Sequence, residues 1–533
     1  MPFLTSVPEA CPRRHRLTAA LAVVLVASAL LAGCSGDDGK LPIPSGAATT
    51  TTNANVYEQQ RADGVTALLD KLSTALATGD TKTLAGLIDA SATPAFRTRL
   101  ETAAANFGTR PPRATSTTTR SSAPSPSAGP TQSPGPSSTE PDNPGRRGAG
   151  GTSTSATPRS TAPKQSGPVS STPARPMPDD SRGSALRLAK LRYQLVLSDE
   201  AETQAPEAIT DKLTDQGSSD VWVAPVELHY ALGGARAPGV DEPELVVNEQ
   251  MVVARYEDDW KVVGDATLIG GNAPATMLWE LAGLRVDDVP TAGGTSVIAS
   301  YPGTADTVER ARGLLPGAVR AVEAFWGVEW PRKVVVVATG TGRQFTQVSG
   351  APDADGAAAA ATVFTGIDAD KTVRGQRIVL TPNAQQIPPP ALGVVLRHEI
   401  THVATRSITS AKAPLWVTEG LAEYVGRKDT YRRLADAAPD LASAVRSGSG
   451  PRTLPADADF AVSGPRAGLA YQSAWSLWAF IATRFGEDKL KSLYRKAAAG
   501  DAAVADAALS TELKITSGDL VTQWRRWLVK EAG

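Results

Sequence analysis

A long segment rich in Pro, Ser, Thr and Gly interrupts this chain of 533 residues. Residues 108–184 contain almost no large apolar side chain, only scattered arginines among turn-forming and hydroxyl residues. Such a composition buries too little apolar surface to offset the entropy that is lost on ordering. We therefore expect this segment to be disordered, and we look for folded domains on either side of it.

The N-terminus has the pattern of a secretory signal. Arginines precede an apolar run at residues 17–31, which is too short for a spanning helix, and small residues follow it. The sequence Leu31-Ala32-Gly33-Cys34 resembles a bacterial lipobox. That resemblance implies a lipoprotein signal peptide at residues 1–33, cleavage before Cys34 and a lipid on its thiol. The alternative is an uncleaved signal anchor.

The lipobox resemblance also implies a location. With Cys34 lipidated and Cys11 removed, no disulfide is expected in the mature chain. Residues 34–55 are Gly, Pro, Ser and Thr rich and are expected to form a flexible tether. We therefore expect the mature chain to be held by its lipid on the extracytoplasmic face of the cell membrane.

Residues 56–268 are predicted to form one α+β domain that contains the disordered insertion at about 108–184. Apolar residues at helical spacing predict two helices within residues 56–107, with Gly79 ending the first and Asp80 capping the second. Residues 186–268 alternate between apolar and polar side chains, as strands of a sheet do.

Helices followed by a meander of long strands resemble the cystatin-like, or nuclear transport factor 2-like, fold. No cluster of catalytic groups appears here, so we expect a spacer or a partner-binding domain, for example for an envelope protein, rather than an enzyme. His229 lies on a predicted strand and is expected to be an ordinary polar or packed residue.

Residues 273–533 are predicted to form a second α+β domain, which carries the chemistry. A helix is expected through residues 308–325, a Gly/Ala loop up to about residue 359, and C-terminal helices that include residues 488–498 and 519–529. Four strands are expected at residues 296–301, 333–339, 361–366 and 377–381. The second of these is apolar at both odd and even positions, as a strand buried on both faces is.

An HExxH sequence follows a run of three prolines in this domain. His398 and His402 are four residues apart on a predicted helix at residues 391–405, so both imidazoles can face one metal ion. A catalytic zinc takes three protein ligands and keeps one position for water. Two of only four histidines in the chain lie in this pentad, which argues against a chance match. The pattern indicates a zinc hydrolase site in which Glu399 is the general base.

The third ligand is expected from the next predicted helix, and Glu419 is the best candidate. HExxH followed after a short gap by Trp416-Val-Thr-Glu-Gly-Leu-Ala-Glu-Tyr424 resembles the gluzincin metallopeptidases of the peptidase MA-like group. This resemblance implies a zincin-like metallopeptidase domain with Glu419 as third zinc ligand. It also implies hydrolysis of peptide bonds by a zinc-bound water, from which Glu399 takes the proton.

Three further residues are assigned around this site. Glu423, one turn after Glu419, is expected to orient a metal-bound histidine, the alternative being a solvated surface glutamate. The family uses a tyrosine or histidine to stabilise the oxyanion. Tyr471 fits that position loosely and Tyr424 competes with it. The edge strand expected at residues 361–366 is the candidate surface for a bound peptide.

Charge and composition limit the remaining possibilities. The formal net charge is −1 and no basic cluster stands out, so nucleic acid is not indicated as a partner. The sequence predicts a membrane-anchored zinc metallopeptidase that acts on a peptide or protein substrate. The alternative is a non-catalytic, lipid-anchored binding or assembly protein whose gluzincin metal site is structural or vestigial.

Overall fold

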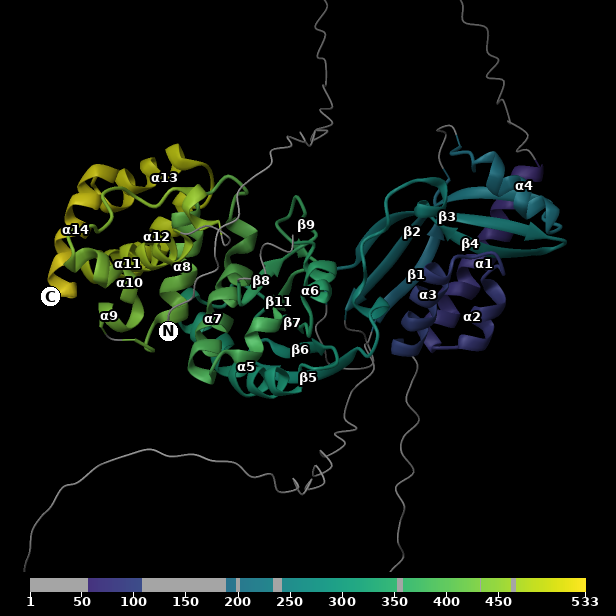
Figure 1. The fold of residues 1–533 in the computed structure, drawn as a ribbon. Helices are drawn as coiled ribbons and strands as arrows, with labels where there is room; N and C mark the ends of the chain where they lie inside the picture. The colour runs from purple at the N-terminus through teal and green to yellow at the C-terminus, as the bar shows by residue number, and fades with distance from the viewer. Residues whose placement is uncertain are drawn as a thin grey trace, which may run out of the picture. The chain divides into compact units, whose positions relative to one another are not determined.

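The computed structural model describes residues 56–107, 188–197, 202–232, 242–351, 358–431, 433–461 and 466–533 (Figure 1). The predicted signal peptide, Cys34, the tether and the insertion at about 108–184 lie outside these residues. None of the helices in the described ranges combines the length and apolar composition that a membrane span requires.

The N-terminal part begins with three helices rather than the two that were predicted: α1 (Val56–Thr78), α2 (Thr81–Leu87) and α3 (Pro94–Phe107). The boundary between α1 and α2 is confirmed. Gly79 has a positive φ of 68°, and the Asp80 side chain accepts a hydrogen bond from the backbone of Thr83. The missed helix α3 buries Phe96, Leu100 and Phe107 against the core.

These helices pack against a four-stranded antiparallel meander with the order β1-β2-β3-β4. Its strands are β1 (Leu188–Leu195), β2 (Asp220–Leu232), β3 (Leu245–Tyr256) and β4 (Asp259–Asp265). The sheet confirms the strand prediction, but a short helix between its first two strands, α4 (Glu207–Asp215), was missed. Pro225 lacks an N–H, and the edge of β2 on which it lies faces Val196, just beyond the end of β1; there the Val196 N–H donates a 3.0 Å hydrogen bond to the Pro225 carbonyl.

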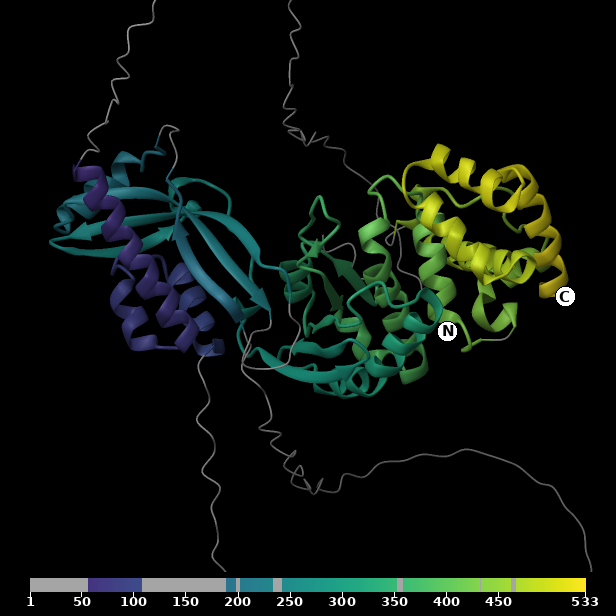
Figure 2. The same ribbon diagram turned by 180° about the vertical axis from the view of Figure 1, so that it is seen from behind.

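A five-stranded mixed sheet organises the remainder, with the order β5-β6-β7-β11-β8 (Figure 2). Its strands are β5 (Arg285–Thr291), β6 (Gly294–Ser300), β7 (Val335–Ala338), β11 (Arg377–Leu380) and β8 (Ala360–Val363). All four predicted strands are confirmed, whereas β5 and the small hairpin of β9 (Gly366–Ile367) and β10 (Val373–Arg374) were not foreseen. Strand β8 lies at the edge and runs antiparallel to β11.

Both faces of this sheet are buried. This was predicted from its central strand, which has apolar residues at both odd and even positions. Val336 and Ile378 belong to the apolar cluster formed with the C-terminal helices. Their neighbours Val335, Val337 and Val379 belong instead to the cluster that also fills the N-terminal α+β part. Successive side chains of a strand point to opposite faces, so each face is covered by a different part of the chain.

Ten helices are described after β6: α5 (Ala305–Trp326), α6 (Gly342–Ser349), α7 (Pro389–Thr405), α8 (Leu415–Arg427), α9 (Leu434–Ala437), α10 (Pro439–Arg446), α11 (Ala467–Phe485), α12 (Glu487–Ala497), α13 (Ala502–Ala508) and α14 (Ser517–Ala532). The predicted helices are confirmed. The loop predicted up to residue 359 is wrong in part, because Thr341 caps α6 there: its hydroxyl accepts from the backbone of Gln344.

Helix α8 is held between α7 and α11 at two glycines. A Cβ on Gly426 would lie 3.0 Å from the carbonyl oxygen of Val394 in α7, and one on Gly420 would lie 2.2 Å from the indole of Trp478 in α11. That indole cannot move aside easily, because it is fully buried and donates a 2.9 Å hydrogen bond to the Trp416 carbonyl. Close approach of the three helices therefore depends on these glycines.

We predict that Gly420→Ala destabilises the protein by about 1–3 kcal/mol, because the added methyl group overpacks a closed core. Gly313→Ala in α5 is the matched control: its Cβ meets no atom within 4 Å, so better helix propensity should raise stability slightly. Urea unfolding followed by tryptophan fluorescence measures both. Equal stabilisation by the two substitutions would show that α8 does not need the close approach.

Candidate metal centre

Helix α7 carries the HExxH sequence on a rigid support. Prolines occupy its first turn, where their missing N–H is not needed. Leu392, Leu396 and Ile400 recur every four residues and are fully buried, so they fix the helix against the core. The side chains of His398 and His402, by contrast, are each 12 % exposed. The helix thus presents both imidazoles on one partly open face.

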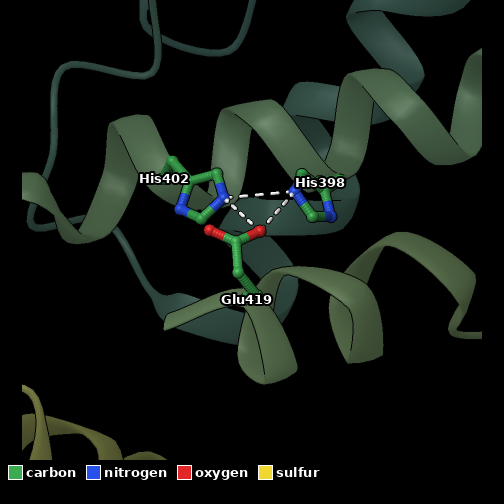
Figure 3. A group of neighbouring side chains, drawn as sticks. All are labelled: His398, His402 and Glu419. Carbon is green, nitrogen blue, oxygen red and sulfur yellow. Dashed lines mark hydrogen bonds and ion pairs between the residues drawn. The ribbon is translucent and has the colours of Figure 1, made fainter. Parts of the chain in front are cut away.

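Glu419 on α8 meets both rings, as predicted (Figure 3). Its Oε2 lies 3.3 Å from Nε2 of His398 and 3.4 Å from Nε2 of His402. The two Nε2 atoms are 3.1 Å apart. Within the described residues, these three form the one group of His, Cys, Asp and Glu side chains placed to hold a metal ion.

The donor set fits zinc. With Zn–N and Zn–O bonds of about 2.0–2.1 Å, tetrahedral geometry separates neighbouring ligand atoms by about 3.3–3.4 Å, close to the three distances observed here. Two imidazoles and one carboxylate also match the chemistry of zinc hydrolase sites, which leave a fourth position for water. The three residues therefore satisfy both the geometric and the chemical requirement for this metal.

The charges around the site favour a cation. Burial alone would raise the pKa of Glu419, but the two neighbouring histidines outweigh it and hold that pKa well below its ordinary range. Burial would likewise lower the pKa of His398, yet its hydrogen bonds to Glu419 and Glu423 raise it well above the ordinary value. Without a metal, a proton on His398 supplies part of the positive charge that these carboxylates require.

Glu423 orients His398 from behind. Its Oε1 lies 3.2 Å from Nδ1 of His398, the ring nitrogen that faces away from Glu419. Its other oxygen binds the guanidinium of Arg427, one turn further along α8. A carboxylate in this position fixes the ring and leaves Nε2 free to bind a metal. The geometry supports the role predicted for Glu423, which is buried rather than solvated.

Glu399 lies beside the ligands and points to the edge of the sheet. Its side chain is buried, and its Oε2 accepts a 2.7 Å hydrogen bond from the Thr362 hydroxyl on strand β8. Thr362 also reaches the backbone carbonyl of Glu399 at 3.3 Å. Sequence reasoning placed an edge strand here but did not identify Thr362, because no local pattern links a strand threonine to a distant helix. Arg427 was also missed, although its place four residues after Glu423 on one helix is a local signal for an ion pair.

The two tyrosines considered for oxyanion stabilisation have different surroundings. The Tyr424 hydroxyl donates a 2.7 Å hydrogen bond to Glu487, and its ring packs against Phe325, so it serves the helix core. The Tyr471 ring lies in α11 and contacts Phe460 edge-on, with 5.2 Å between ring centres. The role of Tyr471 stays a prediction.

His229 is a packed polar residue, as expected. It is buried on β2, where Nδ1 lies 2.9 Å from Glu244 and Nε2 lies 2.9 Å from Glu227. The two carboxylates occupy opposite sides of the ring, so both nitrogens are used within this cluster.

Comparisons with known proteins add little. The sequence matches no family model and no curated protein. Among solved structures, a mutant of an M1 zinc metallopeptidase from Deinococcus radiodurans aligns with 13% identity over 57% of this chain and 62% of that chain, at a TM-score of 0.29. The M1 zinc metallopeptidase from the same organism aligns with 12% identity over 53% and 59%, also at 0.29. The chain thus spans less than two thirds of each protein's length. Similarity at this level carries no functional conclusion, so the inferences below rest on the geometry of the site.

We predict that the purified protein contains about one zinc ion per chain, and that Glu419→Ala abolishes this zinc, because two imidazoles alone leave the coordination incomplete. Glu399→Ala is the matched control and keeps its zinc, since Glu399 is not one of the three side chains that converge to hold a metal. Metal analysis after dialysis measures both variants. Full zinc content in Glu419→Ala would remove this residue from the ligand set.

We further predict that Glu423→Gln lowers zinc affinity about 10- to 100-fold without loss of fold, because His398 loses the charged partner of its Nδ1. Competition with a fluorescent chelator gives the affinity, and circular dichroism checks the fold. An unchanged zinc affinity would assign Glu423 only to its ion pair with Arg427.

Proposed function

We propose that this protein is a zinc-dependent metallopeptidase of the gluzincin type. The observation that carries the proposal is the convergence of His398, His402 and Glu419 on one point, with the carboxylate of Glu399 beside them on the same helix. Chance alignment does not account for a buried carboxylate, two imidazoles and a separate buried base in one place. The site combines a complete ligand set with a group that can accept a proton.

A zinc ion held by these ligands would polarise a water molecule and the substrate carbonyl. With such an ion bound, Glu399 would accept a proton from that water as the water oxygen adds to the carbonyl carbon, and would pass the proton to the amine that leaves when the C–N bond breaks. Thr362 keeps the Glu399 carboxylate in position, through the 2.7 Å hydrogen bond. Glu423 holds the His398 ring in the orientation that directs Nε2 to the metal. Stabilisation of the oxyanion by Tyr471 belongs to this proposal.

The edge strand beside the site supports a peptide as substrate. Among the strands of the described ranges, β8 pairs with β11 alone, so its other side is an edge of the sheet. An extended peptide can add to such an edge through main-chain hydrogen bonds. Thr362 connects this strand directly to Glu399, so a peptide on β8 lies next to the proton-accepting group.

We extend the proposal to the whole chain. A lipid on Cys34 would hold the enzyme on the extracytoplasmic face of the cell membrane, and residues 34–55 and about 108–184 would act as flexible segments. The helices and meander of residues 56–268 support a cystatin-like domain, for which we propose a spacer or partner-binding role toward envelope proteins.

We predict that Glu399→Gln keeps its zinc while the rate of peptide hydrolysis falls about 10²- to 10⁴-fold, because the proton-accepting group is lost. Glu323→Gln, which changes a carboxylate paired with Arg332 outside this site, should retain activity. Turnover of a denatured protein substrate measures both variants of the soluble Cys34→Ala protein. Hydrolysis by fully chelated wild-type protein would reject a metallopeptidase mechanism.

The same Glu399→Gln variant separates this function from the alternative, a binding or assembly protein with a vestigial metal site. A peptidase that binds but does not cleave accumulates its uncut partner, and this is detected when envelope proteins are captured on the variant. A binding protein captures the same partner on the wild-type and variant chains in equal amounts.

A further inference from the structure

Arg406 is a half-buried cation beside the metal centre that forms no ion pair among the described residues, although the charges of Glu419 and Glu399 act on it from a longer distance. It follows directly after α7, in the 3₁₀ turn Arg406–Ile408, four residues beyond His402. Its Nε is shielded from solvent and has no hydrogen-bond partner, and no carboxylate among the described residues forms an ion pair with it. The contact made by its guanidinium is with the Phe364 ring, whose centre lies 4.6 Å away.

The neighbouring arginines differ in this respect. Arg397 donates two hydrogen bonds to the Gly426 carbonyl and one to Thr430, and Arg427 pairs with Glu423. These contacts replace the hydrogen bonds to water that each guanidinium loses on burial. Arg406 makes no comparable contacts: its shielded Nε has no acceptor, which is costly, and its two terminal nitrogens are not among the shielded atoms. A buried polar group without a partner calls for an explanation, and an absent ligand is one.

The position of Arg406 relates it to the reacting centre. Thr362 and Phe364 are two residues apart, and each contacts a residue of the α7 segment: Thr362 meets Glu399, and Phe364 meets Arg406. Glu399 and Arg406 are seven residues apart, which is two helical turns on one face, or roughly 10 Å along the helix. Where α7 packs against β8, Glu399 therefore lies at one point, and Arg406, which has no ion pair, lies further along.

The two-turn separation from Glu399 favours a role beside the reacting carbonyl over one at the carbonyl itself. A donor to the oxyanion must lie about 3 Å from that atom. The Arg406 guanidinium instead contacts the Phe364 ring, 4.6 Å from its centre. Burial lowers the pKa of Arg406, whereas Tyr494, Glu419 and Glu399 act in the opposite direction. The guanidinium nevertheless stays charged, as arginine does in proteins.

We infer that Arg406 recognises a carboxylate of the peptide substrate, two or three residues along the chain from the bond that is cleaved. This inference rests on the proposed peptidase function and narrows it to peptides that carry an acidic group near the cleavage point. A guanidinium presents parallel N–H groups that match the two oxygens of a carboxylate, and Phe364 restricts its orientation. An extended peptide spans roughly 10 Å in three residues, which matches the separation along α7.

The test measures binding rather than turnover. The zinc-loaded Cys34→Ala protein is titrated with peptide hydroxamates, which bind the metal, and which carry Glu or Gln two or three residues from the hydroxamate on either side. We expect one Glu peptide to bind about 10-fold tighter than its Gln counterpart, since hydrogen bonds to a charged group outweigh neutral ones. Arg406→Met should remove this difference and leave the affinity for the Gln peptide and the zinc content unchanged.

Two further variants serve as controls. Arg484→Met removes an exposed arginine that stacks on Phe485 in α11, and it should keep the preference for Glu. Arg406→Lys keeps the charge but loses the two parallel donors, so an intermediate preference is expected.

The possible results separate this inference from the proposed function. Equal binding of all Glu and Gln pairs by the zinc-loaded wild-type protein would overturn the carboxylate site and leave the metal centre standing. This comparison needs no variant, so it holds even if Arg406→Met fails to fold. A preference retained in folded Arg406→Met would also overturn it. Absence of zinc binding by the wild-type protein would overturn both proposals.

Discussion

Three ligand atoms that approach one another to between 3.1 and 3.4 Å dominate this structure. Two imidazole nitrogens and a carboxylate oxygen at these separations are best stabilised by a shared positive charge. Behind them a second carboxylate, Glu423, is also buried, and Arg427 offsets its charge. A cation at the centre and an arginine behind it together balance the negative charge that α8 brings to α7.

The packing of α8 between α7 and α11 holds these side chains in place. Glycine at two positions lets α8 approach α7 on one side and α11 on the other, and the buried hydrogen bond from Trp478 to Trp416 holds α8 against α11. Arg397 adds a clamp between α7 and α8 through the Gly426 carbonyl. Ligand geometry in a metal site tolerates only small errors, so the ligands sit on helices that three independent contacts hold in place.

The mixed sheet contacts both the candidate metal centre and the N-terminal part. At its edge, β8 supplies Thr362 to Glu399 and is followed by Phe364, which contacts Arg406. On its other face, Val335, Val337 and Val379 join the apolar cluster of the N-terminal helices and meander. A buried ion pair between Arg377 and Glu242 adds to this contact. The N-terminal part therefore covers apolar surface of the sheet.

The candidate metal ligands and the proposed proton acceptor were predictable from the sequence, because helical periodicity places residues four apart on one face and histidine is rare in this chain. Strands with apolar residues at both odd and even positions were predictable for a similar reason, since this pattern is typical of a strand that is buried on both faces of its sheet. The additional helices α3, α4 and α6 were missed because they are short or weakly patterned. The ion pair of Arg427 with Glu423 follows from their i,i+4 spacing on α8, although it was not foreseen. The contact of Thr362 with Glu399 and the surroundings of the Arg406 guanidinium depended on the tertiary structure alone. These contacts join residues on different elements or at the end of a helix, where side-chain direction follows from packing and not from any local periodicity.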